Sequence, residues 1–307
     1  MKKIACVGLL IAVMTACQPM GQVAPSGGSQ PGLKVIAAET FLADIAQNVA
    51  GDRLKIESLM PIGVDPHGFE PTPTDVAKIA DSNVLIVNGA GLEVFLARLL
   101  QNAGGQRAVL EASAGLPSRQ LHEGEIADPD HTGDPHFWLD PNNVIKYVEN
   151  IRDGLSSADP EGAAVYAANA EAYIAKLKEL DRWISDRVKE VPAANRLLVT
   201  NHESFGYFAD RYGLKIIGTV VPSVSSDSAP SAQQLAELID RIKATGAKAI
   251  FLETGTNPQL ADQVAQETGS KVVTDMYSHS LTAANGPAPT YIDMMKFNTN
   301  AIVDALK

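Results

Sequence analysis

Short apolar runs rich in β-branched residues alternate with longer segments of helical spacing along this chain. Four such runs lie between residues 34 and 113, and four more follow residue 195: KVIAAE, KIESLMP, NVLIVNG and AVLEAS, then RLLVTN, KIIGTV, KAIFLE and KVVTD. Strands that alternate with helices are typical of parallel sheets. We therefore expect an α/β protein of two lobes, each with a mainly parallel four-stranded sheet flanked by helices.

An uninterrupted segment between the two blocks, from Pro160 to Val191, has the spacing of a single helix. Apolar or small residues recur there in steps of three and four, at Tyr166, Ala170, Tyr173, Leu177, Leu180, Ile184 and Val188. About 30 helical residues would span about 45 Å. The pattern predicts one long rigid helix over 158–192 that joins an N-terminal lobe (33–157) to a C-terminal lobe (193–307). Two helices broken near Asp181 are the alternative.

The first 32 residues have no place in either lobe. Residues 1–16 combine Lys2 and Lys3 with an apolar run too short to span a bilayer, and small residues then precede Cys17. This arrangement resembles a bacterial lipoprotein signal, with Cys17 as the lipidated first residue of the mature chain. An ordinary secretory signal is the alternative. Residues 17–32 are rich in Gly, Ser, Pro and Gln and predict a flexible tether. We expect an extracytoplasmic protein held to the membrane by lipid.

Composition narrows the choice of partners. The net charge of −11 over 307 residues argues against a nucleic-acid partner. The chain has two cysteines, and removal of the signal would take Cys6 with it. The mature protein would then have neither an intramolecular disulfide nor a zinc–thiolate site.

Four polar residues follow predicted strands. His67 and His136 each end an Asp-Pro-His triplet, His202 follows RLLVT, and Asp275 ends KVVTD. Ligands of open α/β sheets bind at the carboxyl ends of the strands, and a preceding proline stiffens the turn that presents each imidazole. A single histidine at such a place is ordinarily a satisfied polar residue, and Asp275 equally suits the cap of a turn. The repeated triplet favours a metal site between the lobes.

Four motifs carry a family resemblance. The segments DPHGFEPTP, DPHFWLDP, VTNHESFGYFADRYG and KVVTDMYSHSL resemble the cluster 9 family of ABC-transporter substrate-binding proteins, the zinc and manganese receptors of bacteria. The resemblance covers residues 33–307. It implies a monomeric binding protein, not an enzyme, that captures one divalent ion with high affinity between its lobes and delivers it to an ABC-type permease.

The resemblance also implies the ligands: His67, His136, His202 and, as an aspartate at the end of the last strand, Asp275. Three imidazoles and one carboxylate favour zinc, because manganese prefers more oxygen ligands; manganese is the alternative ion. His279 is interpreted as structural. The loop 117–134, which holds His122 and His131, is interpreted as a solvated segment.

Two other function classes use similar residues. A zinc hydrolase ordinarily keeps one coordination position open, whereas four protein ligands close a tetrahedron, and the chain has no HExxH segment. A metal-independent adhesin is a further alternative, since lipid-anchored relatives have been described in that way. Adhesion that survives loss of ion binding would favour it.

Overall fold

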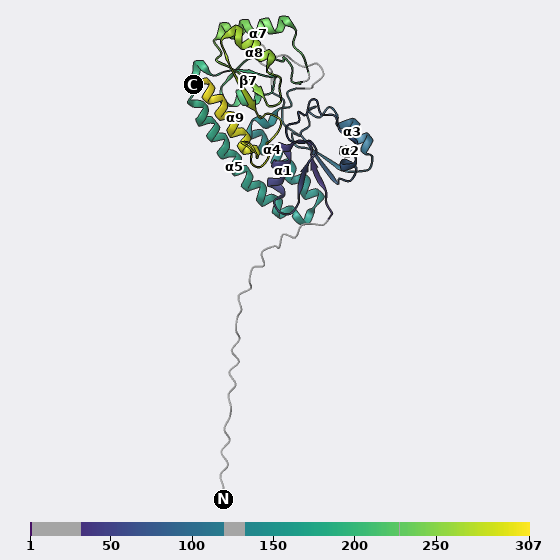
Figure 1. Cartoon of the computed structure of the whole chain (residues 1–307). Coiled ribbons are helices and arrows are strands. Elements are labelled where there is room, and N and C mark those ends of the chain that lie inside the picture. The colour runs from purple at the N-terminus through teal and green to yellow at the C-terminus, as the bar shows by residue number, and fades with distance from the viewer. Residues whose placement is uncertain (2–31, 120–132, 227) are drawn as a thin grey trace.

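The computed structural model of the chain describes residue 1 and residues 32–119, 133–226 and 228–307. The expected signal, Cys17 and most of the expected tether lie outside the described residues, as do His122 and His131. Two lobes lie one above the other beside a long helix (Figure 1). No helix within the described ranges is both long and apolar enough to cross a membrane.

The N-terminal lobe contains a parallel four-stranded sheet in the order β2-β1-β3-β4. Its central strands are buried on both faces, which explains their continuous apolar sequences. Helices α2 and α3 pack on one face, while α1 and α4 lie on the side of the main core. The elements are β1 (Val35–Ala37), α1 (Thr40–Ala50), β2 (Ile56–Ser58), α2 (Pro73–Ala80), β3 (Val84–Val87), α3 (Leu96–Ala103) and β4 (Ala108–Glu111).

The C-terminal lobe repeats this plan with a parallel sheet in the order β6-β5-β7-β8. Helices α7 and α8 cover its outer face, and α6 and α9 lie toward the main core. The elements are β5 (Leu197–Thr200), α6 (Gly206–Tyr212), β6 (Lys215–Thr219), α7 (Ala232–Thr245), β7 (Ala249–Glu253), α8 (Gln259–Thr268), β8 (Lys271–Met276) and α9 (Tyr291–Leu306). A capping box between Ser231 and Gln234 begins α7.

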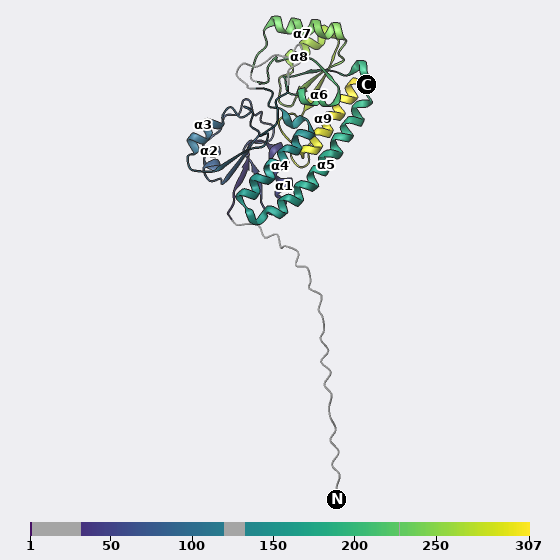
Figure 2. The same ribbon diagram turned by 180° about the vertical axis from the view of Figure 1, so that it is seen from behind.

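One long helix, α5 (Ala163–Lys189), runs along both lobes (Figures 1 and 2). It follows α4 (Pro141–Ala158) and one turn of 3₁₀ helix (Pro160–Gly162), and it packs against α1, α4 and α9. Its buried residues are the seven of the predicted stripe. The helix continues without a break through Asp181, so the alternative of two helices is wrong. The predicted fold of two α/β lobes and a long helix is confirmed.

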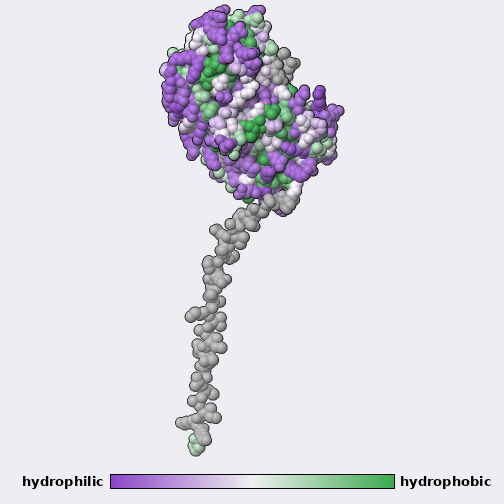
Figure 3. All heavy atoms as spheres, viewed as in Figure 1, coloured by the Kyte–Doolittle hydropathy of each residue, from purple (hydrophilic) through white to green (hydrophobic). Residues whose placement is uncertain are grey.

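The main hydrophobic core is continuous through both lobes. It includes Trp138 at the junction, Leu177 on α5 and Phe251 on β7, all at most 1% exposed. Short 3₁₀ turns, Phe137–Leu139 and Ala193–Asn195, complete the chain path. On the face shown in Figure 3, polar residues cover most of the surface and apolar residues lie in small patches. A shared core predicts that the lobes keep a fixed relative position.

Candidate metal centre

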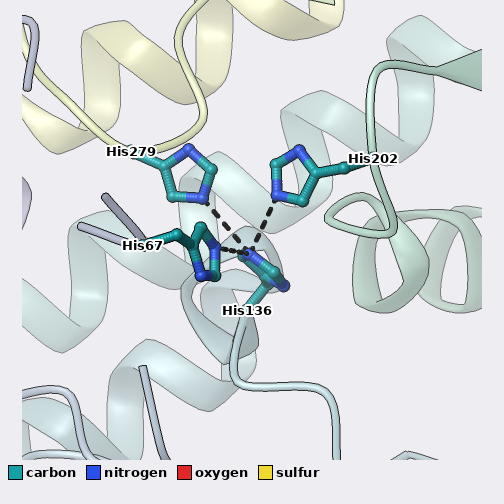
Figure 4. A group of neighbouring side chains, drawn as sticks. All are labelled: His67, His136, His202 and His279. Atoms are coloured by element: carbon teal, nitrogen blue, oxygen red, sulfur yellow. Dashed lines mark hydrogen bonds between the residues drawn. The ribbon is translucent and has the colours of Figure 1, made fainter. Parts of the chain in front are cut away.

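Four buried histidines meet at the junction of the lobes, with ring nitrogens turned toward one another (Figure 4). The Nε2 atom of His136 lies 3.2 Å from that of His67, 3.2 Å from that of His279 and 3.3 Å from that of His202. One ring nitrogen of each side chain lies within 4.8 Å of the others. Such a group of nitrogens has the dimensions of a single-ion site.

Each histidine stands on a different loop at the carboxyl end of a strand. His67 lies between β2 and α2, and His136 lies between β4 and α4. His202 directly follows β5, and His279 lies between β8 and α9. Parallel strands bring all these loops to one edge of each sheet, and the two edges face each other across the junction. Each lobe therefore supplies two imidazoles.

The structure places Asp275 away from this group. Its side chain is exposed and accepts a hydrogen bond from Thr274 Oγ1 at 3.2 Å. The backbone of Asp275 has a φ of 69°, unusual for a residue other than glycine. The register between β7 and β8 shifts nearby. His279, interpreted as structural from the sequence, instead joins His67, His136 and His202.

The opposite ring nitrogens of three histidines contact polar groups. His136 Nδ1 lies 2.9 Å from Asp134 Oδ1, and His202 Nδ1 lies 2.9 Å from Glu253 Oε2. His279 Nδ1 lies 2.9 Å from Ser278 Oγ and 4.0 Å from the same Glu253 oxygen. A carboxylate at Nδ1, as beside His136 and His202, holds the proton there and leaves the Nε2 lone pair for a metal. These contacts orient the rings for metal binding.

Burial and neighbouring charges set the protonation of the centre. Burial lowers the pKa of His136 and His67 well below the usual value, with further lowering by the other histidines, and it also lowers the pKa of His279. Burial acts in the same sense on His202, but the charge and hydrogen bond of Glu253, together with the charges of Asp65 and Asp134, outweigh it and raise the pKa of His202. At neutral pH, three rings are therefore held in the neutral form that binds metal.

The carboxylates around the histidines differ in their own pKa. Burial of Glu253 would raise its pKa, yet the nearby His202 and His279 lower it well below the usual range. Burial raises the pKa of Asp134 to about 7, opposed by the His136 backbone N–H and the charge of Arg119. Glu253 is therefore the more firmly ionised of the two.

Two hydrogen bonds join the lobes at the margin of the centre. Ser226 Oγ donates to Asp65 Oδ2 at 2.6 Å, and the backbone N–H of Gly63 donates to Ser280 Oγ at 2.7 Å. Asp65 also accepts the backbone N–H of His67 at 3.0 Å. These two hydrogen bonds thus connect the segment that carries His67 to the C-terminal lobe.

The donor set is all nitrogen. Zinc binds imidazole nitrogen at about 2.0–2.1 Å, so a regular tetrahedron of four such ligands has edges of about 3.3–3.4 Å. The three Nε2 separations of 3.2, 3.2 and 3.3 Å lie close to these edges. Four protein nitrogens at this spacing suit the capture of an ion and leave no open position for a substrate.

Comparison with known proteins identifies the family. Residues 35–305 match the family model described as the zinc-uptake complex component A, periplasmic. This chain belongs to that zinc-uptake component A family. It is 35% identical over 308 residues to the manganese-binding lipoprotein MntA of Halalkalibacterium halodurans, covering 100% of this chain and 99% of the relative. It is also 32% identical to the iron-binding protein YfeA of Yersinia pestis, over 88% of this chain and 85% of the relative.

Solved structures of periplasmic metal-binding proteins share the fold. The Mn-bound S38A mutant of a periplasmic metal-binding protein from Candidatus Liberibacter asiaticus has a TM-score of 0.80 at 30% identity, covering 90% of this chain and 100% of the other. The periplasmic zinc-binding protein TroA of Treponema pallidum has a TM-score of 0.81 at 26% identity, with coverage of 90% and 99%. This chain is accordingly a metal-binding substrate-binding protein of the ABC-transporter type, and not an enzyme.

Proposed function

We propose that this protein captures zinc outside the cytoplasm with high affinity and delivers it to the permease of an ABC transporter. The ligands in this proposal are His67, His136, His202 and His279. The observation that supports it is the gathering of four buried histidines, in which His136 Nε2 lies 3.2–3.3 Å from the Nε2 atoms of the other three, with no carboxylate among the group. Imidazole suits zinc, whereas manganese prefers carboxylate, carbonyl and water oxygens.

Manganese is the second candidate, because relatives are named for it. Other relatives are named for iron or zinc, so their names support several ions. The composition of this centre favours zinc among them.

The four histidines come from one chain, which supports a monomer as the working unit.

The signal that precedes Cys17 supports lipid attachment at that cysteine and anchoring to the outer face of the cell membrane. Where the host has an outer membrane, this anchor lies on the periplasmic side. Fractionation of a Cys17→Ala variant tests the anchor: the variant should leave the membrane fraction while the intact protein stays in it.

Elemental analysis of the protein purified without chelators tests the choice of ion, followed by competition between zinc and manganese for the apoprotein. We expect one zinc per chain, and a large excess of manganese should be needed to displace it. Displacement of zinc by manganese at similar free concentrations would overturn the assignment.

A further inference from the structure

A centre of four neutral imidazoles lacks the negative charge that a divalent ion requires when it is removed from water. A buried ion is stable only when nearby charges or dipoles compensate its own charge. In this centre the metal-facing atoms are the Nε2 atoms of His67, His136, His202 and His279, all of them neutral when they bind. The compensating charge must therefore come from side chains behind the rings.

Glu253 is placed to supply that charge. It is the last residue of β7, and its side chain is 6% exposed. One oxygen, Oε2, lies 2.9 Å from His202 Nδ1 and 4.0 Å from His279 Nδ1. A single carboxylate atom thus lies beside both histidines of the C-terminal lobe.

Hydrogen bonds to both carboxylate oxygens keep Glu253 in this position. Ser204 Oγ donates to Oε1 at 2.9 Å, and Asn201 Nδ2 lies 3.5 Å from Oε2. The ion-pair partners of Glu253 within the described ranges are His202 and His279. By contrast, Asp134 behind His136 also faces Arg119, whose Nη1 lies 3.7 Å away. Arg119 therefore already balances part of the charge of Asp134, whereas the ion-pair partners of Glu253 are the two histidines.

We propose that Glu253 is a positioning residue that determines the specificity of the centre, because it orients two ligands at once and balances the ion from outside the coordination sphere. A carboxylate behind the rings lets the coordination sphere remain all nitrogen, which favours zinc over ions that prefer oxygen. This inference rests on the proposed function, since it assumes that the four histidines hold the ion.

Substitution of Glu253 by glutamine tests the proposal, because it keeps the shape and removes the charge. The zinc affinity of the Glu253→Gln variant should fall about 10- to 100-fold, the range found when a partner behind a metal-binding histidine is removed. The absorption spectrum of the cobalt(II) form should also change, because His202 and His279 would lose their fixed orientation. An affinity within twofold of the wild type with an unchanged cobalt spectrum would overturn the proposal.

Two additional variants keep the test decisive. Glu253→Asp retains the charge but withdraws it by one methylene, so its zinc affinity should lie between those of the wild type and the glutamine variant. An unchanged affinity in Glu253→Asp would overturn the proposal if the glutamine variant failed to fold.

Glu93→Gln is the control for loss of a buried carboxylate. Glu93 is buried and accepts the backbone N–H groups of Asn88 and Gly89, so the zinc affinity of the Glu93→Gln variant should match that of the wild type. Failure of the wild-type protein itself to bind zinc would instead refute the proposed function.

Discussion

The Nε2 atoms of His136 and His279 lie 3.2 Å apart, although 143 residues separate the two histidines in the sequence. His136 belongs to the N-terminal lobe and His279 to the C-terminal lobe, so this contact joins the halves of the molecule at the centre. It also gives the centre a fourth nitrogen where a carboxylate was expected. The choice of ion should therefore depend on residue 279.

Replacement of His279 by aspartate should move the preference of the centre toward manganese. The variant would present three nitrogens and a carboxylate, and oxygen ligands suit manganese better. We expect the ratio of zinc to manganese affinity to fall at least about tenfold, which corresponds to about 1.4 kcal/mol. Competition titrations of the two ions would measure it. An Asp275→Asn variant is the matched control, because this exposed carboxylate lies outside the histidine group, and its ratio should equal that of the wild type.

The sequence predicted the strands and α5 well because both follow from local spacing. Each of the eight apolar runs coincides with a strand to within a few residues, and the stripe from Tyr166 to Val188 is the buried face of α5. Periodicity of this kind depends only on residues close in the chain. Three of the four clustered histidines were also among the predicted ligands, since each follows a predicted strand.

His279 was missed because its placement depends on a loop that no local pattern determines. Asp275 was chosen for its position at the end of an apolar run, but the positive φ of that residue and the register shift between β7 and β8 belong to the folded sheet. The signal that could have found His279 was its place in the loop after the last strand. His67 and His136 likewise lie in the loops that follow their strands and not at the strand ends.

Removal of one ring should abolish most of the zinc affinity without unfolding the protein. We expect His136→Ala to weaken zinc binding by more than about 100-fold, beyond the loss that follows removal of a partner behind a ligand. The Nε2 atom of His136 lies 3.2–3.3 Å from the Nε2 atom of each of the other three rings. Calorimetric titration measures the affinity, and circular dichroism of the metal-free variant checks the fold. Unchanged affinity would remove His136 from the site.

Zinc affinity should decrease as the pH falls. The pKa of His202 is raised in the metal-free protein, and those of His67, His136 and His279 are lowered, so His202 takes up a proton first. A protonated imidazole cannot bind metal. Below the pKa of His202, affinity should fall about tenfold per pH unit, and more steeply once the other rings are protonated. Competition titrations between pH 5 and 8 would show this, and equal affinities at pH 5 and 7.5 would contradict it.

Metal binding should leave the arrangement of the lobes nearly unchanged. The helix α5 and the main core both extend through the two lobes, and neither provides a hinge. Release of the ion should then depend on local movement near the contacts that Asp65 makes with Ser226 and Gly63 makes with Ser280. Solution scattering of the metal-free and zinc-bound forms should give the same radius of gyration within error. A clear compaction on zinc binding would show that the lobes close as rigid bodies.

The stripe on α5 should contribute strongly to stability. Leu177 is fully buried in the main core, so Leu177→Ala should lower the free energy of unfolding by about 2–5 kcal/mol. Glu179 lies on the exposed side of the same helix. Glu179→Ala should therefore change the free energy of unfolding by no more than about 0.5 kcal/mol. Chemical denaturation of the two metal-free variants and the wild type would measure these changes in the free energy of unfolding. Similar losses for both variants would mean that α5 is not held by its apolar face.

Because every one of the four rings is carried by its own loop, a single codon change can exchange one donor atom while the other three stay where they are. The fold need not change for the protein to bind a different ion. A lineage of such proteins can thus drift from one transition metal to another in small steps, and relatives of one shape can serve organisms whose mineral supplies differ.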